Sequence, residues 1–272
     1  MLRPETDVDA PAREALIVSI PIGICMAAGL LVAIEEWKWL RRKGQLTREV
    51  RVEMALSLSL LPPNLVVSLL AGGAWAAIYL AAAEAAPWHI EIGVLAAIIA
   101  FIACDFSYYW EHRCAHRVGL LWRLYHAHHH SSPHYTVATA YRVCFLNQAL
   151  APAFYLPWVL LGLPPLLVFG FQLACFHYQA WLHTELIGPL HRFDGWLNTP
   201  ANHRVHHSVA ERHVDRNMGA VLMIWDQVFA TYAKPEPRVV YGIAGAASPR
   251  RWWEIYVQPW RTAFRSGKGA RA

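Results

Sequence analysis

The chain has 272 residues, of which 56% are hydrophobic and 16% are charged, and its formal net charge is +5. Soluble domains carry roughly 25% charged residues, so this composition indicates an integral membrane protein. The positive charge does not indicate nucleic-acid binding, because the basic residues lie beside apolar segments, where such residues usually set membrane topology.

The first predicted membrane span is the uncharged stretch from Ala15 to Ile34. A helix of roughly 20 residues is long enough to cross about 30 Å of hydrocarbon. Six Lys and Arg residues follow between Glu35 and Glu53, and we expect them to form a short cytoplasmic loop by the positive-inside bias. The amino terminus would then lie outside.

Two further spans are predicted before the polar part of the chain. The stretch from Met54 to Trp88 is apolar, but a proline pair at 62–63 interrupts it. This pattern predicts an interfacial turn followed by a span from Leu65 to Ala83. The next apolar run, Ile92 to Cys104, predicts a span that returns to the cytoplasm and continues as a helix.

Histidines cluster directly after the third span, in the segment DFSYYWEHRCAHRVGLLWRLYHAHHHS from Asp105 to Ser131. These histidines form two clusters. Those of the first cluster are four residues apart, and those of the second follow the pattern i, i+3, i+4. On a helix such spacings place the side chains on one face. The first cluster is His112 and His116, and the second is His126, His129 and His130.

An apolar stretch at about 143–182 follows, and prolines divide it into two halves. We expect a membrane hairpin with its tip near Gly162 to Pro165. It is formed either by two spans or by a pair of helices that enters the membrane and returns without crossing. In both cases the chain comes back to the side it left, so His183 would reach the same face as the first two clusters.

A third cluster, His203, His206 and His207, repeats the i, i+3, i+4 pattern in a polar segment. One histidine per cluster would satisfy any packing role, so eight in three sets indicate a metal site with more than one ion. Neutral imidazole suits Fe, Cu, Zn or Ni, and a structural zinc site needs only four ligands. The HExxH motif of a zinc protease is not present here, because Glu111 precedes His112 instead of following it.

These motifs resemble those of the fatty acid hydroxylase and sterol desaturase superfamily, which are integral-membrane di-iron oxygenases. DFSYYWEHRCAH resembles the HxxxH box of that family, HAHHHS its first HxxHH box, and HRVHHS its second. The likeness covers roughly Asp105 to Tyr232. QAWLHTELIG, NTPANHRVHH and IWDQVFATY look most like the alkylglycerol monooxygenase branch. The resemblance implies nine metal ligands, of which His183 is identified by the resemblance alone. The nine are His112, His116, His126, His129, His130, His183, His203, His206 and His207.

Two positions depart from what the resemblance implies. Met218 stands where the alkylglycerol branch commonly has an aromatic residue, which bears on the substrate channel and not on the metals. Ala230 stands where relatives commonly have a glycine before the threonine. We expect this second change to be tolerated, with a possible shift of the turn after Phe229.

The predicted fold is an all-α integral-membrane bundle of four or five spans with a cytoplasmic, histidine-rich helical cap. Residues 1–104 would form an amino-terminal transmembrane region, and residues 105–232 a catalytic region that includes the hairpin. Residues 233–272 would form a carboxy-terminal tail. The segment RRWWEIYVQPWRTAFR in this tail has two interpretations, a helix on the membrane surface or a frayed terminus.

The resemblance implies an oxidoreductase that uses O₂ to hydroxylate or desaturate a lipid C–H bond, with two Fe ions as cofactors. Its partners would be a lipid substrate from the bilayer, O₂ and an external electron donor. The reductant would be tetrahydrobiopterin if the alkylglycerol branch is the right one. Two alternatives stay open: a sterol or fatty-acid desaturase or hydroxylase fed by a protein electron donor, and a non-catalytic membrane protein that binds or transports zinc.

Several other polar residues near the clusters have two interpretations. Asp105 could hold a ring nitrogen of a ligand, or it could cap a helix or bond between helices. A similar choice, between supporting a ligand and shaping a loop, applies to Asp215, Asn217 and Asp226. We interpret His177 as a core histidine more readily than as a spare ligand, and His128 and His134 as supporting or surface groups. The ordinary surface histidines are expected to be His89, His191 and His213.

Overall fold

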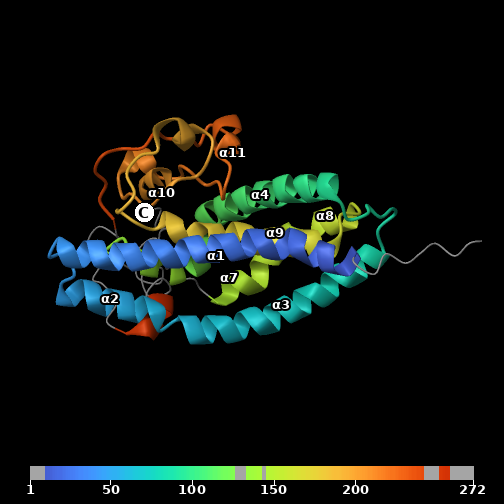
Figure 1. Cartoon of the computed structure of the whole chain (residues 1–272), viewed down its shortest axis with the longest axis horizontal. Helices are drawn as coiled ribbons and strands as arrows, with labels where there is room; N and C mark the ends of the chain where they lie inside the picture. Colours follow the sequence, from blue (N-terminus) through green and yellow to red (C-terminus); the bar gives the residue numbers. More distant parts are fainter. Residues whose placement is uncertain (1–9, 126–132, 143–144, 242–250, 258–272) are drawn as a thin grey trace, which may run out of the picture.

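Four helices run side by side along the long axis of the molecule, and a group of short helices covers one end (Figure 1). The computed structural model describes residues 10–125, 133–142, 145–241 and 251–257. The four helices are α1 (Ala10–Arg42), α3 (Leu61–Glu84), α4 (Val94–Arg117) and α9 (Pro165–Tyr178). Within the described residues the β structure is one isolated bridge between Leu197 and Leu222, so the predicted all-helical class is confirmed.

Three helical segments among the described residues are long and apolar enough to cross a membrane. They are α1, the run from α2 (Arg48–Leu58) through α3, and α4. Pro62 and Pro63 lie in the first turn of α3, where a missing backbone N–H costs little because it has no partner within the helix. The helix α4 continues without a break past Cys104, so the third span and the first histidine cluster belong to one helix.

The predicted loop from Glu35 to Glu53 is mostly helical, so that prediction is wrong in its extent. Helix α1 continues to Arg42, and α2 begins at Arg48. Lys and Arg are good helix formers, and in the last turn of a helix they interact favourably with its dipole, so the basic run extends α1. Gly44, with a φ of +67°, lies just beyond its end in the conformation that often terminates helices.

Within the predicted hairpin the chain turns at Gly162, near which its tip was expected. The φ of this glycine is +85°, and a Cβ there would come within 2.6 Å of Trp88. The returning arm, α9, has 14 residues and is about 21 Å long, less than the roughly 30 Å of a hydrocarbon core. Helix α9 is not among the three candidate spans of the described residues. The other arm consists of α7 (Phe145–Leu150), η2 (Ala151–Phe154) and α8 (Leu156–Leu160).

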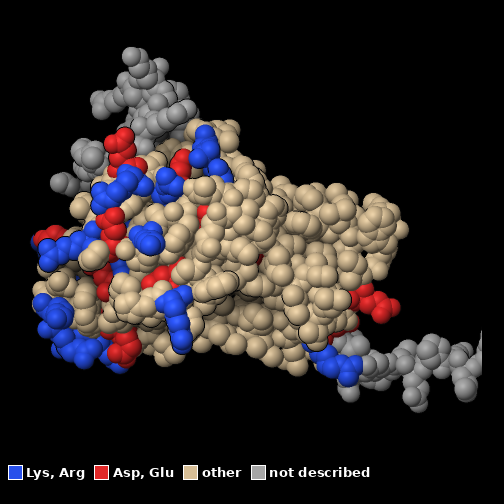
Figure 2. Space-filling view, turned by 90° about the horizontal axis from the view of Figure 1, so that it is seen from above, with Lys and Arg blue, Asp and Glu red and all other residues tan. Residues whose placement is uncertain are grey.

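The apolar core lies between α1, α3, α4, α8 and α9, with Tyr79, Ala100 and Leu167 fully buried. The outward faces of the same helices are also apolar, since Leu70 and Val94 are both more than 70% exposed. Figure 2 shows most charged side chains gathered toward one end, separated by a broad uncharged band from a few at the other end. A soluble protein rarely exposes such a band, whereas a lipid bilayer would cover it.

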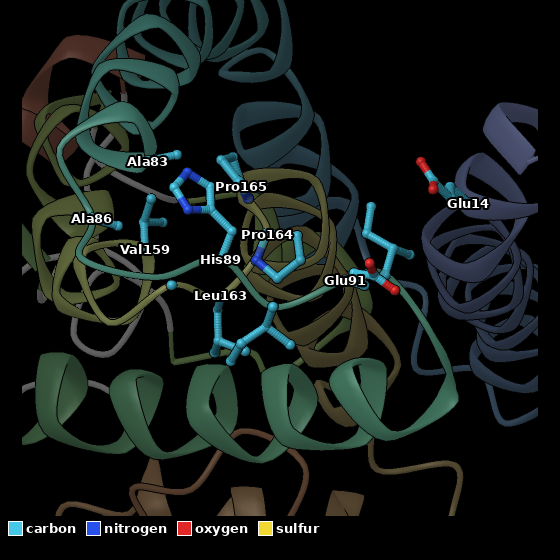
Figure 3. A pocket seen from close by; sticks show the side chains of 12 residues that line it. Glu14, Ala83, Ala86, His89, Glu91, Val159, Leu163, Pro164 and Pro165 are labelled. Atoms are coloured by element: carbon cyan, nitrogen blue, oxygen red, sulfur yellow. The ribbon is translucent and has the colours of Figure 1, made fainter. Parts of the chain in front are cut away.

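A cavity of about 450 Å³ lies at the hairpin tip, beside the amino-terminal end of α4 (Figure 3). Its lining includes His89, Glu91 and Pro164. The histidines of α4 lie at the other end of that helix, so this cavity is separate from the histidine clusters. His89 is exposed, in agreement with its predicted surface location.

The cap is the part of the chain from His183 to Tyr241. Its elements are short because Pro, Gly and polar residues recur throughout the segment. In order they are η4 (His191–Gly195), α10 (Pro200–His206), η5 (Glu211–His213) and α11 (Ile224–Val228). In Figure 1 the labelled helices α10 and α11 lie beside one end of the bundle, which brings the third histidine cluster near the end of α4.

Candidate metal centre

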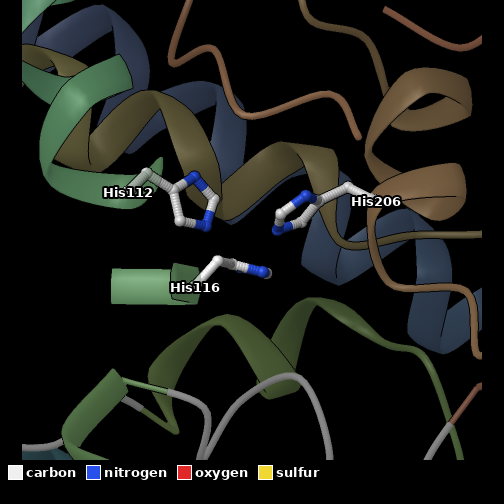
Figure 4. A group of neighbouring side chains, drawn as sticks. All are labelled: His112, His116 and His206. Atoms are coloured by element: carbon white, nitrogen blue, oxygen red, sulfur yellow. The ribbon is translucent and has the colours of Figure 1, made fainter. Parts of the chain in front are cut away.

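Three histidines from two distant segments form a first group. His112 and His116 lie one turn apart on α4, and His206 is the last residue of α10. One ring nitrogen of each lies within 4.8 Å of the others, and the three rings face a common point (Figure 4). This geometry could hold a metal ion.

A second group consists of His183, His203 and His207, all three buried. The Nε2 atom of His203 lies 3.1 Å from Nε2 of His183 and 3.1 Å from Nε2 of His207. Such convergence of three imidazole nitrogens is a typical donor set for Fe, Cu, Zn or Ni. The second group therefore could also hold an ion.

The short helix α10 supplies side chains to both groups. Its start is fixed by Thr199, whose side chain accepts the N–H of Asn202 at 3.4 Å, and by Pro200 in the first turn. The ring centroids of His203 and His206 are 5.3 Å apart, and the two rings are nearly parallel. The two groups are therefore immediate neighbours.

Backbone carbonyls orient three of the six rings. The Nδ1 atoms of His112, His183 and His206 lie 3.0, 2.8 and 2.7 Å from carbonyl oxygens of Met218, Gln179 and Arg216. A carbonyl only accepts hydrogen bonds, so Nδ1 is the protonated nitrogen and Nε2 keeps its lone pair. In metal sites this arrangement fixes both the tautomer and the direction of a ligand ring.

The charge state of the cap histidines also suits metal binding. Burial lowers the pKa of His183 to about 4, and burial together with neighbouring histidines lowers the pKa of His206 well below its usual range. Both imidazoles are therefore neutral at pH 7, which is the form that binds metals.

The structure brings together six of the nine predicted ligands, three in each group. Spacing alone placed His203, His206 and His207 in one cluster, whereas the structure divides them between the two groups. The remaining predicted ligands lie outside the described residues: His126, His129 and His130. His128 lies there as well.

Among the other histidines, His177 and His134 belong to neither group, and His191 is exposed as predicted. His213 does not lie on the surface, so that prediction is wrong. Its side chain is buried, and its Nε2 atom lies 3.1 Å from a carboxylate oxygen of Glu236. The segment that carries Glu236 comes back to η5, a tertiary contact that no local pattern in the sequence indicates.

Asp105 forms hydrogen bonds between elements. Its carboxylate accepts the N–H of Val221 at 2.8 Å and the indole N–H of Trp225 at 2.8 Å. It thereby attaches the start of α11 to α4. The second of its two predicted interpretations is the one that these contacts support.

Asp226 supports His112 through the backbone. One oxygen accepts the N–H of Met218 and the other the N–H of Gly219, both at 2.8 Å. The carbonyl of that same Met218 holds the His112 ring, while the Met218 side chain is fully buried. Asp226 therefore fixes the peptide on which the orientation of His112 depends.

Asp215 lies beside a candidate ligand. Its Oδ1 lies 3.6 Å from Nδ1 of His116, and its Oδ2 lies 3.4 Å from Nε of Arg117. Asn217 shapes the loop instead, since its side chain bonds to the carbonyl oxygens of Asn202 and Ala233. Both residues have φ above +50°, a conformation that Asp and Asn tolerate better than most.

Two residues outside the predicted set shape the second group. Tyr135 stacks on His183 with ring centroids 5.5 Å apart, and its ring centroid lies 5.1 Å from that of His207 in an edge-to-face arrangement. Glu36 of α1 is 1% exposed and accepts hydrogen bonds from the Thr184 hydroxyl at 2.6 Å and the N–H of Val137 at 2.9 Å. In the sequence, Glu36 is indistinguishable from the exposed acids of a basic stretch.

Comparison with known proteins gives a consistent result. The sequence pattern of the family described as fatty acid hydroxylase matches residues 97–231. Alkylglycerol monooxygenase of Danio rerio is 38% identical over 157 residues, which are 58% of this chain and 35% of that protein. Alkylglycerol monooxygenase of Homo sapiens is 41% identical over 144 residues, 53% of this chain and 32% of that protein.

An ornithine lipid hydroxylase of Rhizobium tropici is 33% identical over 142 residues, 51% of this chain and 42% of that protein. The chain thus spans about a third of the length of the alkylglycerol monooxygenases that it matches. No solved structure matches the chain.

Proposed function

Because this chain belongs to the fatty acid hydroxylase family through residues 97–231, we propose that it is a membrane-bound di-iron oxygenase acting on a lipid. It would use O₂ to hydroxylate or desaturate an unactivated C–H bond. The observation that carries this proposal is the pair of adjacent three-histidine groups, which lie within the matched residues. One group would suffice for a single ion, so two neighbouring groups fit two ions better.

The residues present fit the two proposed ions. His112, His116 and His206 would hold one, and His183, His203 and His207 the other. Each ion would then have four or five imidazole ligands once the remaining three predicted ligands are added. These are His126, His129 and His130. Iron bound in this way would supply the activation of O₂, which no amino-acid side chain can perform.

The chain's own residues would place the ligands and exclude water. Carbonyl groups hold three rings through Nδ1, so that Nε2 would be the ligand atom, and Tyr135 packs against His183 and His207. Five of the six histidines are buried, and His116 is partly buried. A buried, preformed site of this kind would keep water away from the reacting groups.

We propose the cytoplasmic face as the location of the centre. Lys38, Arg41 and Arg42 lie in the last turns of α1, and Figure 2 shows basic side chains gathered at one end of the molecule. Such enrichment is typical of the cytoplasmic side of a membrane protein. A lipid would then present its reactive carbon where the bilayer meets the cytosol.

The names of the relatives favour a polar-headgroup lipid as the substrate, and an alkylglycerol monooxygenase-like reaction in particular. In that case tetrahydrobiopterin would be the external reductant. A protein electron donor remains the alternative for a sterol or fatty-acid enzyme. To distinguish these two reductants, purified protein is supplied with each one in turn. The oxidised lipid product is then measured by mass spectrometry.

Lipid mass spectrometry of cells with and without the chain tests the proposal. We expect a lipid that gains one oxygen or loses two hydrogens, and about two Fe per chain in protein purified without oxygen. His203→Ala should abolish the product and lower the iron content, whereas His177→Ala, outside both groups, should change neither. Tightly bound zinc without any lipid product would instead support the non-catalytic alternative.

A further inference from the structure

A row of apolar side chains, spaced by four residues, winds along α4 and ends beneath the cap. Val94, Ile98 and Ile102 follow one another at intervals of four residues and are all exposed. The same spacing continues to Phe106 and Trp110. Because α4 is a candidate span, the exposed part of this row is the part that would face lipid.

The cap covers the end of this row with aromatic rings. The ring of Phe106 lies 5.0 Å from that of Trp225, and the ring of Trp110 lies 5.0 Å from that of Phe229. Figure 1 shows α11 beside this end of α4. Four residues of a helix rise about 6 Å, so Phe106, which contacts Trp225 of α11, lies about 6 Å along the helix axis beyond the exposed Ile102.

Apolar side chains on the cap remain exposed next to this contact. Ile224 and Val228 are exposed on α11, and Trp196 and Phe193 are exposed on the neighbouring segment that contains η4. The two segments are joined by a hydrogen bond of 3.0 Å from the N–H of Met223 to the carbonyl of Trp196. We call Phe193, Trp196, Ile224 and Val228 the rim patch.

Cationic side chains flank the aromatic rings of this region. The Arg192 guanidinium lies 5.1 Å from the ring centroid of Phe193, and that of Arg113 lies 5.4 Å from the centroid of Trp110. Arginine can stack on an aromatic ring while it binds a phosphate. Aromatic, aliphatic and arginine side chains together are typical of the interfacial layer of a bilayer.

We infer that the rim patch is a membrane-docking surface of the cap, which inserts among the headgroups and upper acyl chains of the leaflet around α4. The partner is bilayer phospholipid, because the patch continues the row of α4 that would face lipid. Amphipathic surfaces of this kind enter a membrane by about 5–10 Å, which agrees with the short distance along α4. This inference does not depend on the proposed catalytic activity.

Photo-crosslinking of the full chain in phosphatidylcholine nanodiscs tests the docking surface. A benzophenone amino acid replaces Val228, or Trp196 in a second variant, and mass spectrometry identifies what each position captures. The matched control is Val240, another cap valine, which is 69% exposed and so slightly more exposed than Val228 at 64%. We expect a mass increase of one phospholipid at positions 228 and 196, in several-fold higher yield than at position 240.

Equal yields at positions 228 and 240 would overturn the inference, because exposure alone would then explain the adducts. Crosslinks between two copies of the chain in place of lipid adducts would also overturn it, since the patch would then be a contact between protomers. The same label at Ile98 serves as the positive control within α4. All these sites are exposed, so the substitutions should leave the fold intact, and circular dichroism of each variant checks this.

Discussion

The Nδ1 atom of His112 lies 3.0 Å from the carbonyl oxygen of Met218, a residue 106 positions later in the chain. This contact joins a helix that could span the membrane to a loop of the cap. The loop peptide is itself held by the carboxylate of Asp226, which accepts the N–H groups of Met218 and Gly219. The orientation of a proposed metal ligand thus depends on an acid that acts on it through a backbone peptide.

Substitution of Asp226 should therefore disturb the first histidine group. In Asp226→Asn one carboxylate oxygen becomes an N–H₂ group that faces a backbone N–H, leaving a buried donor unsatisfied at a cost of roughly 1–3 kcal/mol. We expect lower stability in chemical unfolding and weaker metal retention, measured by metal analysis after dialysis. Glu211→Gln, which changes an exposed acid of the same cap, should match the unmodified protein in both measurements.

Glu36 should matter for the second group in the same way. Glu36→Ala removes the acceptor of the Val137 N–H and the Thr184 hydroxyl, and Thr184 directly follows His183. Buried donors left without an acceptor cost roughly 1–3 kcal/mol each, so we expect the segment around His183 to shift. The metal content should fall from about two ions per chain toward about one.

The neighbouring acid provides the control for this experiment. Glu35 is exposed and bonds to the exposed Lys38 on the same helix. Exposed ion pairs contribute only about 0–1 kcal/mol, so Glu35→Ala should keep its metal. Equal metal loss in both variants would refute a specific role for Glu36.

Ala230 should be a site where glycine stabilises the protein. Its φ is +56°, a left-handed conformation that costs a non-glycine residue roughly 1–2 kcal/mol. Ala230→Gly relieves this strain, partly offset by about 0.4–1 kcal/mol of added chain entropy in the unfolded state. The midpoint of chemical unfolding should rise slightly. Ala233→Gly, at a position without positive φ, should lower it, and a decrease in both variants would contradict the argument.

The contact between Glu236 and η5 should depend on pH. The hydrogen bond from Arg212, with a further contribution from His213, lowers the pKa of Glu236 to about 2, below the usual 4.5. A carboxylate with a lowered pKa stabilises the folded state above its unfolded pKa, and this contribution is lost as the pH falls through the folded value. Glu236→Gln should therefore be less stable than the unmodified protein near neutral pH.

That difference should shrink as the pH falls from about 4.5 toward about 2. Chemical unfolding of both proteins at several pH values measures it, and subtraction of the two curves removes the titration of all other groups. A difference that stays constant over this range would show that the carboxylate charge is not what stabilises the contact.

Much of the fold follows from simple properties of the sequence. The lengths of the apolar runs predicted α1, α3 and α4, and Pro164, Pro165 and Gly162 predicted the hairpin tip. The prediction of a loop for the basic stretch after Ile34 was wrong. Charge indicates on which side of a membrane a segment lies, but not whether the segment is helical. Lys and Arg continue a helix as readily as they form a loop.

The site was predicted in part, because spacing identifies residues that share a helix face but not their partners. At 100° per residue, His203 and His207 differ in direction by about 40°, whereas His206 and His207 differ by about 100°. His207 therefore joins His203 in the second group, while His206 turns toward α4. The contacts of Glu36, Tyr135 and His213 arise from chain segments distant in sequence, which no local pattern reports.

The helix α10 contributes to both histidine groups within about one turn, through His203 and His206. The spacing between the His203 and His206 side chains, one in each group, is therefore set by the geometry of one helix. Unwinding this helix, for example by loss of its Thr199 cap, would dismantle both positions at once. Assembly of the centre should accordingly be all-or-none, so that the chain carries either both ions or neither whenever α10 is the part that fails.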